Sequence, residues 1–382
     1  MNKIKEFAFI ICAGWSLTIS CSSEDPAITS ELNQLNITED LRILADHEDV
    51  LIGNFSGLTV DKKGIIYVAD SQLQKIHLFS PGGEYIESIG REGRGPGDFV
   101  RMDAHLRILS DTLYVKDNNT HRISLFNLNS RQLIRTLNIP DAELDNLPMG
   151  RSRDIFPMPD GTILVSFLNP YIQSPEEGAE RHKITISRID NSGEFVEKNI
   201  LQLPVLFPTN QMVVLLSSNA INIMSGLSFY PDTRMGIDPD GNLFIGNTDS
   251  LSIWQYHDNG NKAAALEGTP PVIALTTAHL DSISDSRGLN NLDEVFNKAG
   301  RPENWPAYEY FLFDDRGRCW IKLKQPGKPE QTWWVFDENK ELKWNFQLPE
   351  EINLYEVKNG YAYGIAQPED DLRSIVRYQI SN

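Results

Sequence analysis

Seven polar residues stand near the start of apolar segments of the chain and could act together on one ligand. They are Arg101, His105, Arg153, Asp154, Arg234, Glu309 and Tyr355. Arginine presents a planar fork of N–H donors that fits carboxylate oxygens. If the fold gathers the three arginines at one place on the surface, they would attract a carboxylate, an acidic sugar or a peptide terminus. The alternative is that each arginine pairs with a neighbouring acid, such as Asp103, Asp154 or Glu309.

Aromatic residues gather late in the chain and offer a second kind of ligand contact. They are Trp305, Tyr308, Tyr310, Trp320, Trp333 and Trp334. Aromatic rings stack on sugars, but in strands they more often fill the core. Trp333 and Trp334 are neighbours and must face opposite sides of a strand, so we expect one of them, together with Trp320, in the core. Trp305 lies in a polar, Pro-rich segment and is expected to form an exposed platform.

A strand–turn–strand pattern repeats along the chain and must position these residues. It occurs at 58–70, 155–165, 235–245, 311–321 and 355–363. Each copy is an apolar run, a tight polar turn and a second apolar run. A recurring unit of this kind fixes an architecture, and short strands with frequent turns favour an all-β sandwich, barrel or propeller.

Two further strands complete each unit, and the units number six. Residues 114–117 and 122–126 repeat 67–70 and 75–79, which reveals a second unit although its turn lacks glycine. Surplus length predicts an insertion at 276–305 with short helical stretches. The segment 40–53 has no partner turn and is expected to add a strand to the last unit, because this removes exposed sheet edges.

The segment Gly90–Phe99 resembles the NHL-repeat signature, a glycine-rich link that ends in an aromatic residue and leads into the next blade. Glycine permits positive φ, and Pro96 fixes φ within the bend. The segment lacks the Lys-Ser/Thr pair and the following helix of a phosphate-binding loop. Together with its first residues, the chain is similar to the six-bladed β-propeller lipoproteins of Gram-negative bacteria. The resemblance implies an all-β propeller of four-stranded antiparallel blades over 41–382, and says little about activity.

Asp70 and Asp117 occupy the same place in two units, five residues before Lys75 and Arg122. We expect each aspartate to make a salt bridge across its hairpin or a contact within its turn. In the NHL family this aspartate is typically structural, so the resemblance implies the same role here.

The first 20 residues are typical of a signal peptide, with Lys3 and Lys5 before an apolar stretch too short to span a membrane. Residues 17–21 resemble a bacterial lipobox that would place a lipid on Cys21, although Thr18 holds the usual aliphatic position. An ordinary secretory signal is the alternative. Residues 21–40 are predicted to be a flexible tether. We expect an outer membrane lipoprotein, at the cell surface or facing the periplasm.

The net charge of −18 argues against nucleic acid as a partner, because acidic surfaces repel phosphate backbones. We expect contact with the membrane through the lipid anchor only, and a monomer. Cys319 is the one cysteine beyond Cys21 and lies in an apolar run, which predicts a buried thiol.

These patterns favour a binding or scaffold protein that recognises a glycan, a peptide or a partner protein at one face of the propeller channel. No cofactor is expected, although a divalent cation such as calcium would suit the alternative. That alternative is a metal-dependent hydrolase or lyase with a site in the channel, similar to the sugar-lactonase propellers, which use a Glu/Asn/Asp metal set. Glu309, Asn118 and Asn247 are available for this, but no spacing marks them as ligands. No His-Glu-x-x-His pattern or Gly-x-Ser-x-Gly elbow occurs.

Overall fold

The computed structural model describes residues 32–140, 143–144, 147–148, 152–168, 183–204, 213–217, 220–224, 227–257, 260–287, 292–368 and 372–381. The predicted signal peptide, Cys21 and most of the predicted tether lie outside these residues. In the part of the chain described, no helix is long and apolar enough to cross a membrane.

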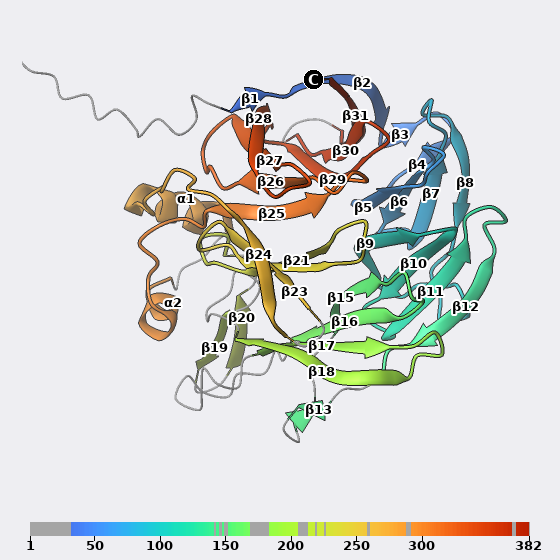
Figure 1. The fold of residues 1–382 in the computed structure, drawn as a ribbon, viewed down its shortest axis with the longest axis horizontal. Helices are drawn as coiled ribbons and strands as arrows, with labels where there is room; N and C mark the ends of the chain where they lie inside the picture. Colours follow the sequence, from blue (N-terminus) through green and yellow to red (C-terminus); the bar gives the residue numbers. More distant parts are fainter. Residues whose placement is uncertain are drawn as a thin grey trace, which may run out of the picture. The chain divides into compact units, whose positions relative to one another are not determined.

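The described residues from 33 to 381 form six large sheets, each built from four strands in antiparallel succession, and one of these sheets gains a fifth strand. The first three blades are β5 (Phe55–Val60), β6 (Ile66–Asp70), β7 (Lys75–Phe79) and β8 (Tyr85–Ile89); β9 (Met102–Leu109), β10 (Thr112–Asp117), β11 (Arg122–Asn127) and β12 (Leu133–Asn138); and β15 (Ser152–Pro157), β16 (Ile163–Leu168), β17 (Lys183–Ile189) and β18 (Phe195–Pro204). The first strand of each sheet faces a common axis (Figure 1).

The remaining blades complete the ring. They are β21 (Thr233–Ile237), β22 (Leu243–Asn247), β23 (Ser252–Tyr256) and β24 (Lys262–Glu267); β25 (Tyr308–Phe313), β26 (Cys319–Leu323), β27 (Glu330–Phe336) and β28 (Leu342–Pro349); and β29 (Ile352–Lys358), β30 (Tyr361–Ala366) and β31 (Ser374–Ser381) with β2 (Asn36–Leu44). The predicted six-bladed architecture is therefore confirmed.

An aspartate holds the turn between the first and second strands in blades one, four and five. Asp61 accepts hydrogen bonds from the main-chain N–H groups of Lys63 and Ile65, at 2.8 and 2.9 Å. Asp238 and Asp314 do the same in their own turns. The glycine three residues later has φ between 81 and 87° in all three blades, a conformation that strains any other residue. These residue types therefore fix the hairpins that the sequence pattern predicts.

The N-terminal strand β2 closes the ring, as predicted. It pairs antiparallel with β31 from Asn36 to Leu44, and it is the outer strand of the last blade (Figure 1). The predicted end of the tether at residue 40 is wrong, because β1 (Asn33–Gln34) and β2 already occupy part of 33–40. A shift in register between Glu39 and Leu41 interrupts the alternation of apolar residues, which hides the first half of β2 in the sequence.

The glycine-rich link between blades one and two is folded on itself. Phe99 is fully buried, and its N–H donates to the carbonyl of Arg91 at 2.8 Å. A Cβ at Gly90 would lie 2.3 Å from the Phe99 ring, so only glycine fits there. The N–H of Gly93 donates to the carbonyl of Phe99. The link thus uses main-chain donors internally, which agrees with a blade link rather than a phosphate loop.

Aromatic side chains fill the junction between blades five and six. Trp320 and Trp333 are both buried there and pack with Phe346. Trp334 faces the other way and is buried as well, in a space that Gly268 leaves open. The expectation of a core role for Trp320 is confirmed, and both members of the Trp333–Trp334 pair are in the core. Cys319 is also buried.

Three short hairpins and two helices lie outside the blades. The hairpins pair β3 (Asp46–His47) with β4 (Val50–Leu51), β13 (Glu143–Leu144) with β14 (Leu147–Pro148), and β19 (Val213–Ser217) with β20 (Ala220–Met224). The helices α1 (Thr277–Arg287) and α2 (Leu292–Ala299) fall inside the predicted insertion and lie outside the ring (Figure 1). Leu280 of α1 packs against Leu227 and Phe229, which fixes the insertion to the chain segment before β21.

Candidate functional site

Eight charged residues meet where the first strands of blades three to five begin, and we call them the axial cluster. They are Lys116, Arg153, Asp154, Asp232, Arg234, Glu309, Lys322 and Lys324. The start of each first strand pairs with the end of the second strand, so β15, β21, β25 and the ends of β10 and β26 contribute to the same end of the axis.

One buried aspartate joins the two arginines of this cluster. An oxygen of Asp232 lies 3.3 Å from a terminal nitrogen of Arg153 and 3.2 Å from one of Arg234. Arg153 also contacts Asp154 at 3.3 Å, and Nε of Arg234 donates to the Glu309 carbonyl at 2.8 Å. The arginines therefore link three consecutive blades, and their guanidinium groups are held in place before any ligand arrives.

Two lysines hold the side chain of Glu309. Nζ of Lys324 lies 2.7 Å from one carboxylate oxygen, and Nζ of Lys322 lies 3.2 Å from the other. Burial by itself would raise the pKa of Glu309, but the ammonium groups of Lys324 and Lys322 outweigh it and hold that pKa below its usual range. Glu309 is therefore a carboxylate at neutral pH.

Lys116 and Lys322 occupy the same place on the second strands of blades two and five. Each is almost fully buried, and each reaches the first strand of the next blade. Nζ of Lys116 donates to the Arg153 carbonyl at 2.8 Å, and Nζ of Lys322 donates to Oδ1 of Asn353 at 3.0 Å. A lysine inside an otherwise apolar strand was the sequence signal that could have predicted this role.

Among the eight residues of the axial cluster, cations outnumber carboxylates. Five of its members are cations and three are carboxylates, which leaves a formal charge of +2 in a protein whose total is −18. Arg234 keeps 29% of its side chain exposed, so part of this charge reaches solvent. A concentrated cationic site in an acidic protein attracts anions over several ångströms.

The structure brings four of the predicted site residues together: Arg153, Asp154, Arg234 and Glu309. It also shows that the two arginines pair with acids, the alternative that the sequence left open. The sequence analysis missed Asp232, Lys116, Lys322 and Lys324. These residues come from four different strands or loops, so no local spacing connects them.

Arg101 and Tyr355 are not among the residues of these ion pairs. Arg101 is exposed just before β9, and its main chain bonds to Asp117 and Asn118. His105 lies within β9, but its side chain is outside the described parts. Tyr355 is half-buried on β29 where the register shifts, and burial raises the pKa of its phenol.

The prediction that Trp305 is an exposed platform is wrong. Only 7% of the residue is exposed, and its ring packs edge-on against Phe229. Nε1 of Trp305 donates to Nδ1 of His279 on α1 at 3.1 Å, and the ammonium of Lys324 lies over the ring. The polar, Pro-rich surroundings suggested exposure, but the segment before β21 and helix α1 cover the ring.

A second polar group lies at the opposite end of the axis. Oγ1 of Thr59 donates to Glu356 at 3.1 Å, and Nζ of Lys358 lies 3.7 Å from the same carboxylate. Burial raises the pKa of Glu356 above its usual range, although Lys358 and Thr59 act in the other direction. The two ends of the axis therefore differ, with a cationic excess at one end and a protonation-sensitive acid at the other.

Two of the three residues available for a metal set, Glu309 and Asn118, are already engaged by lysines, whereas the buried Oδ1 of Asn247 has no hydrogen-bond partner among the described residues. Both oxygens of Glu309 face lysines, and Oδ1 of Asn118 accepts a hydrogen bond from Lys116. Within the described ranges, no group of three or more His, Cys, Asp or Glu side chains is arranged to hold a metal ion. We therefore derive no metal chemistry from these residues.

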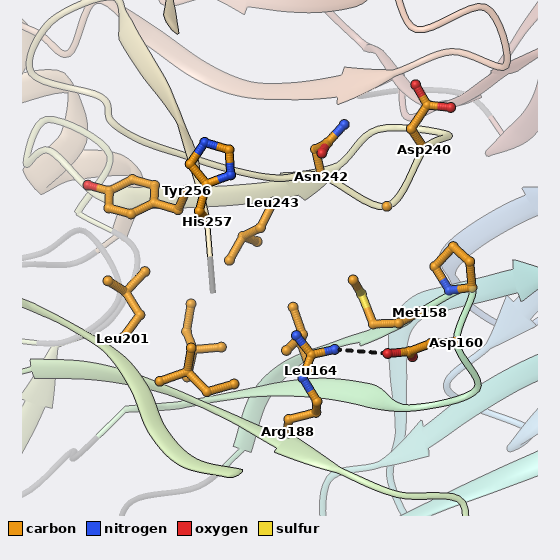
Figure 2. A pocket seen from close by; sticks show the side chains of 14 residues that line it. Met158, Asp160, Leu164, Arg188, Leu201, Asp240, Asn242, Leu243, Tyr256 and His257 are labelled. Atoms are coloured by element: carbon orange, nitrogen blue, oxygen red, sulfur yellow. Dashed lines mark hydrogen bonds and ion pairs between the residues drawn. The ribbon is translucent and has the colours of Figure 1, made fainter. Parts of the chain in front are cut away.

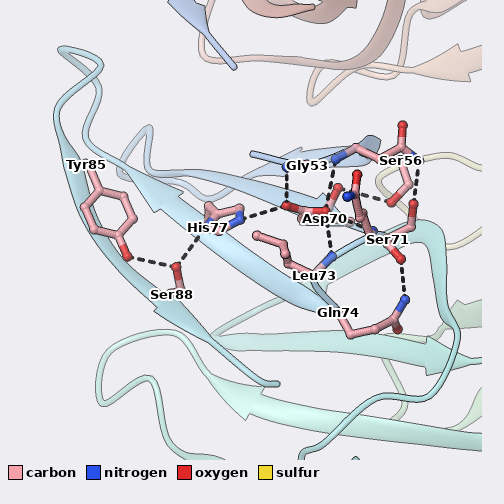
Figure 3. A network of polar contacts seen from close by, with 12 residues as sticks. Gly53, Ser56, Asp70, Ser71, Leu73, Gln74, His77, Tyr85 and Ser88 are labelled. Atoms are coloured by element: carbon pink, nitrogen blue, oxygen red, sulfur yellow. Dashed lines mark hydrogen bonds and ion pairs between the residues drawn. The ribbon is translucent and has the colours of Figure 1, made fainter. Parts of the chain in front are cut away.

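Blade one contains a buried chain of polar side chains that joins its outer three strands (Figure 3). Nε2 of His77 faces Asp70 at 3.3 Å, Nδ1 of His77 faces Oγ of Ser88 at 2.7 Å, and the Tyr85 hydroxyl lies 2.8 Å from Ser88. The residue types match a Ser–His–Asp triad. Asp70, however, also accepts four main-chain N–H groups, from Gly53, Asn54, Gln72 and Leu73.

Asp117 does the same in blade two without a histidine, since it accepts the N–H groups of Val100, Arg101, Asn119 and Thr120. The two aspartates therefore make turn contacts that hold the chain entering a blade against the end of its second strand. Arg122 instead donates to carbonyls of the glycine-rich link. This supports a structural role for both aspartates.

Comparison with known proteins agrees with this geometry. The family model DUF5128, described as a 6-bladed beta-propeller, matches residues 43–167. The chain is a six-bladed β-propeller. No curated protein matches it.

Solved structures resemble the propeller at low sequence identity. A Bacteroides fragilis protein described as exported is 12% identical, with a TM-score of 0.54 and coverage of 91% of this chain and 96% of the other. A member of the DUF4221 family from Bacteroides vulgatus is 14% identical, with a TM-score of 0.53 and coverage of 92% and 99%. A virginiamycin B lyase from Staphylococcus aureus is 14% identical, with a TM-score of 0.45 and coverage of 91% and 99%. These likenesses concern the fold alone.

Proposed function

We propose that this propeller is a binding protein that recognises a carboxylate-bearing ligand, an acidic glycan or an acidic peptide, at the axial cluster. The observation that carries the proposal is the pair of fixed arginines, since neighbouring groups hold Arg153 and Arg234 in place while 29% of the Arg234 side chain stays exposed. Arginine and lysine side chains already held by neighbours lose little freedom on binding, which favours affinity.

The part-exposed guanidinium of Arg234 is the expected first contact. Its Nε is fixed by the Glu309 carbonyl, and its Nη1 is fixed by Asp232. These contacts hold the planar group in one orientation, and a fixed guanidinium is well suited to bidentate carboxylate recognition. Arg153, with 13% of its side chain exposed, would add charge from the neighbouring blade.

Replacing the arginines tests this proposal. A glycan and peptide array probed with the protein starting after Cys21 would first identify a ligand. Arg153→Met and Arg234→Met are each expected to weaken its binding by about 1–3 kcal/mol, because each removes charge-assisted hydrogen bonds. Isothermal titration calorimetry would measure the dissociation constants.

Lys62→Met is the matched control, since Lys62 is an exposed cation in the turn after β5, and turns of this kind lie at the other end of the axis. This variant should bind as the unchanged protein does. Equal affinity of the unchanged protein and the Arg153→Met/Arg234→Met double variant, with melting temperatures preserved, would leave the arginines a purely structural role.

We further propose that the propeller is displayed from the outer membrane by a lipid on Cys21. The resemblance of 17–21 to a lipobox supports this, and the described propeller starts only about a dozen residues later, at β1. Two or more acyl chains would give a stable anchor, since each buried methylene contributes about 0.8 kcal/mol.

Cys21→Ser is expected to move the protein from the membrane fraction to the soluble fraction of a Gram-negative host. Immunoblotting of fractionated cells would measure this, together with incorporation of a labelled fatty acid. The Cys12→Ser variant, which alters the other cysteine of the N-terminal segment, should remain membrane-bound and labelled. Membrane retention of Cys21→Ser would contradict lipidation at this residue.

A further inference from the structure

A cavity of about 330 Å³ opens between blades three and four, and no residue of the axial cluster lines it (Figure 2). Blade three contributes one wall through β16, β17 and β18. Blade four contributes the other wall through the turn at 240–242 and the end of β23. The volume falls within the range of ligand-binding pockets, about 300–1,000 Å³.

The cavity exists because aliphatic side chains fill this junction incompletely. Neighbouring blades diverge away from the axis, so the outer part of each junction needs large side chains. Between blades five and six, Trp320, Trp333 and Phe346 supply them. Between blades three and four, Leu164, Ile186 and Leu243 stand there, and Ile200 and Leu201 remain only partly buried. The hollow therefore contains apolar surface, beside its polar groups, that a ligand could cover.

Polar side chains stand on both walls of the cavity, Asp160 and Arg188 on blade three and Asp240, Asn242 and His257 on blade four. Arg188, with 9% of its side chain exposed, lies 3.4 Å from an oxygen of Asp160 and donates to Oγ1 of Thr162 at 3.0 Å. Asp160 is 59% exposed. Figure 2 shows the pair at the lower wall, facing Asn242 and His257 across the cavity. A donor and an acceptor thus stand side by side next to apolar walls.

We infer that this cavity binds a peptide segment that inserts an apolar side chain between blades three and four. The inserted side chain would cover Ile200 and Leu201, and the peptide N–H would donate to the exposed Asp160 carboxylate. A sugar fits less well, because a single phenol ring, that of Tyr256, stands among five leucine and isoleucine side chains in the lining. An anion fits less well too, because the Asp160 carboxylate stands beside Arg188. This site is independent of the axial cluster and of its proposed ligand.

Methyl NMR spectroscopy of the propeller tests the inference. With ¹³C-labelled Ile and Leu methyl groups, titration with the tripeptide acetyl-Ala-Phe-Ala-amide is expected to shift Ile186, Ile200, Leu201 and Leu243 in a saturable way. Acetyl-Ala-Gly-Ala-amide should shift none of them. Leu201→Trp fills the cavity and is expected to weaken the tripeptide about tenfold or more, because its apolar contact surface is lost.

Ile134→Trp is the matched control, since Ile134 is an exposed residue on β12 that lies outside the cavity lining. It should bind the tripeptide unchanged, as should Arg234→Met. If Leu201→Trp does not fold, the smaller filling variant Ile200→Phe replaces it. Unchanged binding in the filled variant would overturn the inference. So would shifts spread over the whole surface, or saturable shifts with decanoate and none with the peptide.

Discussion

A protein that begins at Asp46, and therefore lacks β2, is expected to lose most of its stability. β2 is the outer strand of blade six, and its Ile43 is buried while Ile37 and Leu41 pack against the cores on either side. Burying side chains of this size contributes about 1.5–3 kcal/mol each, so the loss would reach about 5 kcal/mol. Net stabilities of about 5–15 kcal/mol leave little reserve for such a loss. Urea unfolding followed by tryptophan fluorescence would measure it.

Removal of residues 1–32 is the matched control, because β1 begins at Asn33. This shorter truncation is expected to unfold at the same urea concentration as the full chain. The longer truncation should also aggregate, since β31 would expose an unpaired edge. A cooperative, monomeric protein of undiminished stability that starts at Asp46 would contradict the view that β2 closes the ring.

Asp70→Ala is expected to destabilise the propeller by about 3–5 kcal/mol. The substitution removes the acceptor of four main-chain N–H groups and of the buried His77, and breaking a buried charged network on one side costs about this much. Asp117→Ala removes the equivalent acceptor in blade two and should also lower the free energy of unfolding. Asp111→Asn changes an exposed aspartate and should leave the free energy of unfolding unchanged.

The dependence of the free energy of unfolding on pH separates the contribution of the Asp70 charge from the contribution of its packing. Burial would raise its pKa, but the hydrogen bonds from His77, Leu73, Gly53 and Asn54 outweigh this and lower the pKa to about 2. Because the folded value lies below the unfolded value of about 3.9, the carboxylate contributes roughly 2.5 kcal/mol above pH 4. This contribution is lost as the pH falls from about 4 to about 2.

Urea unfolding between pH 2 and pH 6 would measure that dependence. Asp70→Asn keeps the shape of the side chain but cannot ionise, so its stability should fall less steeply over the same range. Equal slopes in the unchanged protein and Asp70→Asn would show that the Asp70 carboxylate does not carry the acid sensitivity.

The repeat pattern determined the propeller because each of its signals is local. An aspartate such as Asp238 and a glycine such as Gly241 make a turn whatever lies around them, and Gly90 with Phe99 forms a link that only glycine allows. Six such units, placed side by side, close into a single ring. The strand β2 was predicted in place but not in length, since its register shift at Glu39–Leu41 breaks the local alternation.

Tertiary structure alone decided how the charges and the late aromatic residues are used. Asp232 contacts Arg153, which lies on a strand about 80 residues earlier in the chain, and Lys322 contacts Asn353 across a blade junction. The spacing of these residues in the sequence therefore predicts neither contact. The burial of Trp305 depends on Phe229 and helix α1, which its own neighbours do not reveal. Hairpins follow from neighbouring residues, whereas ion pairs and buried surfaces depend on distant segments that only the closed ring brings into contact.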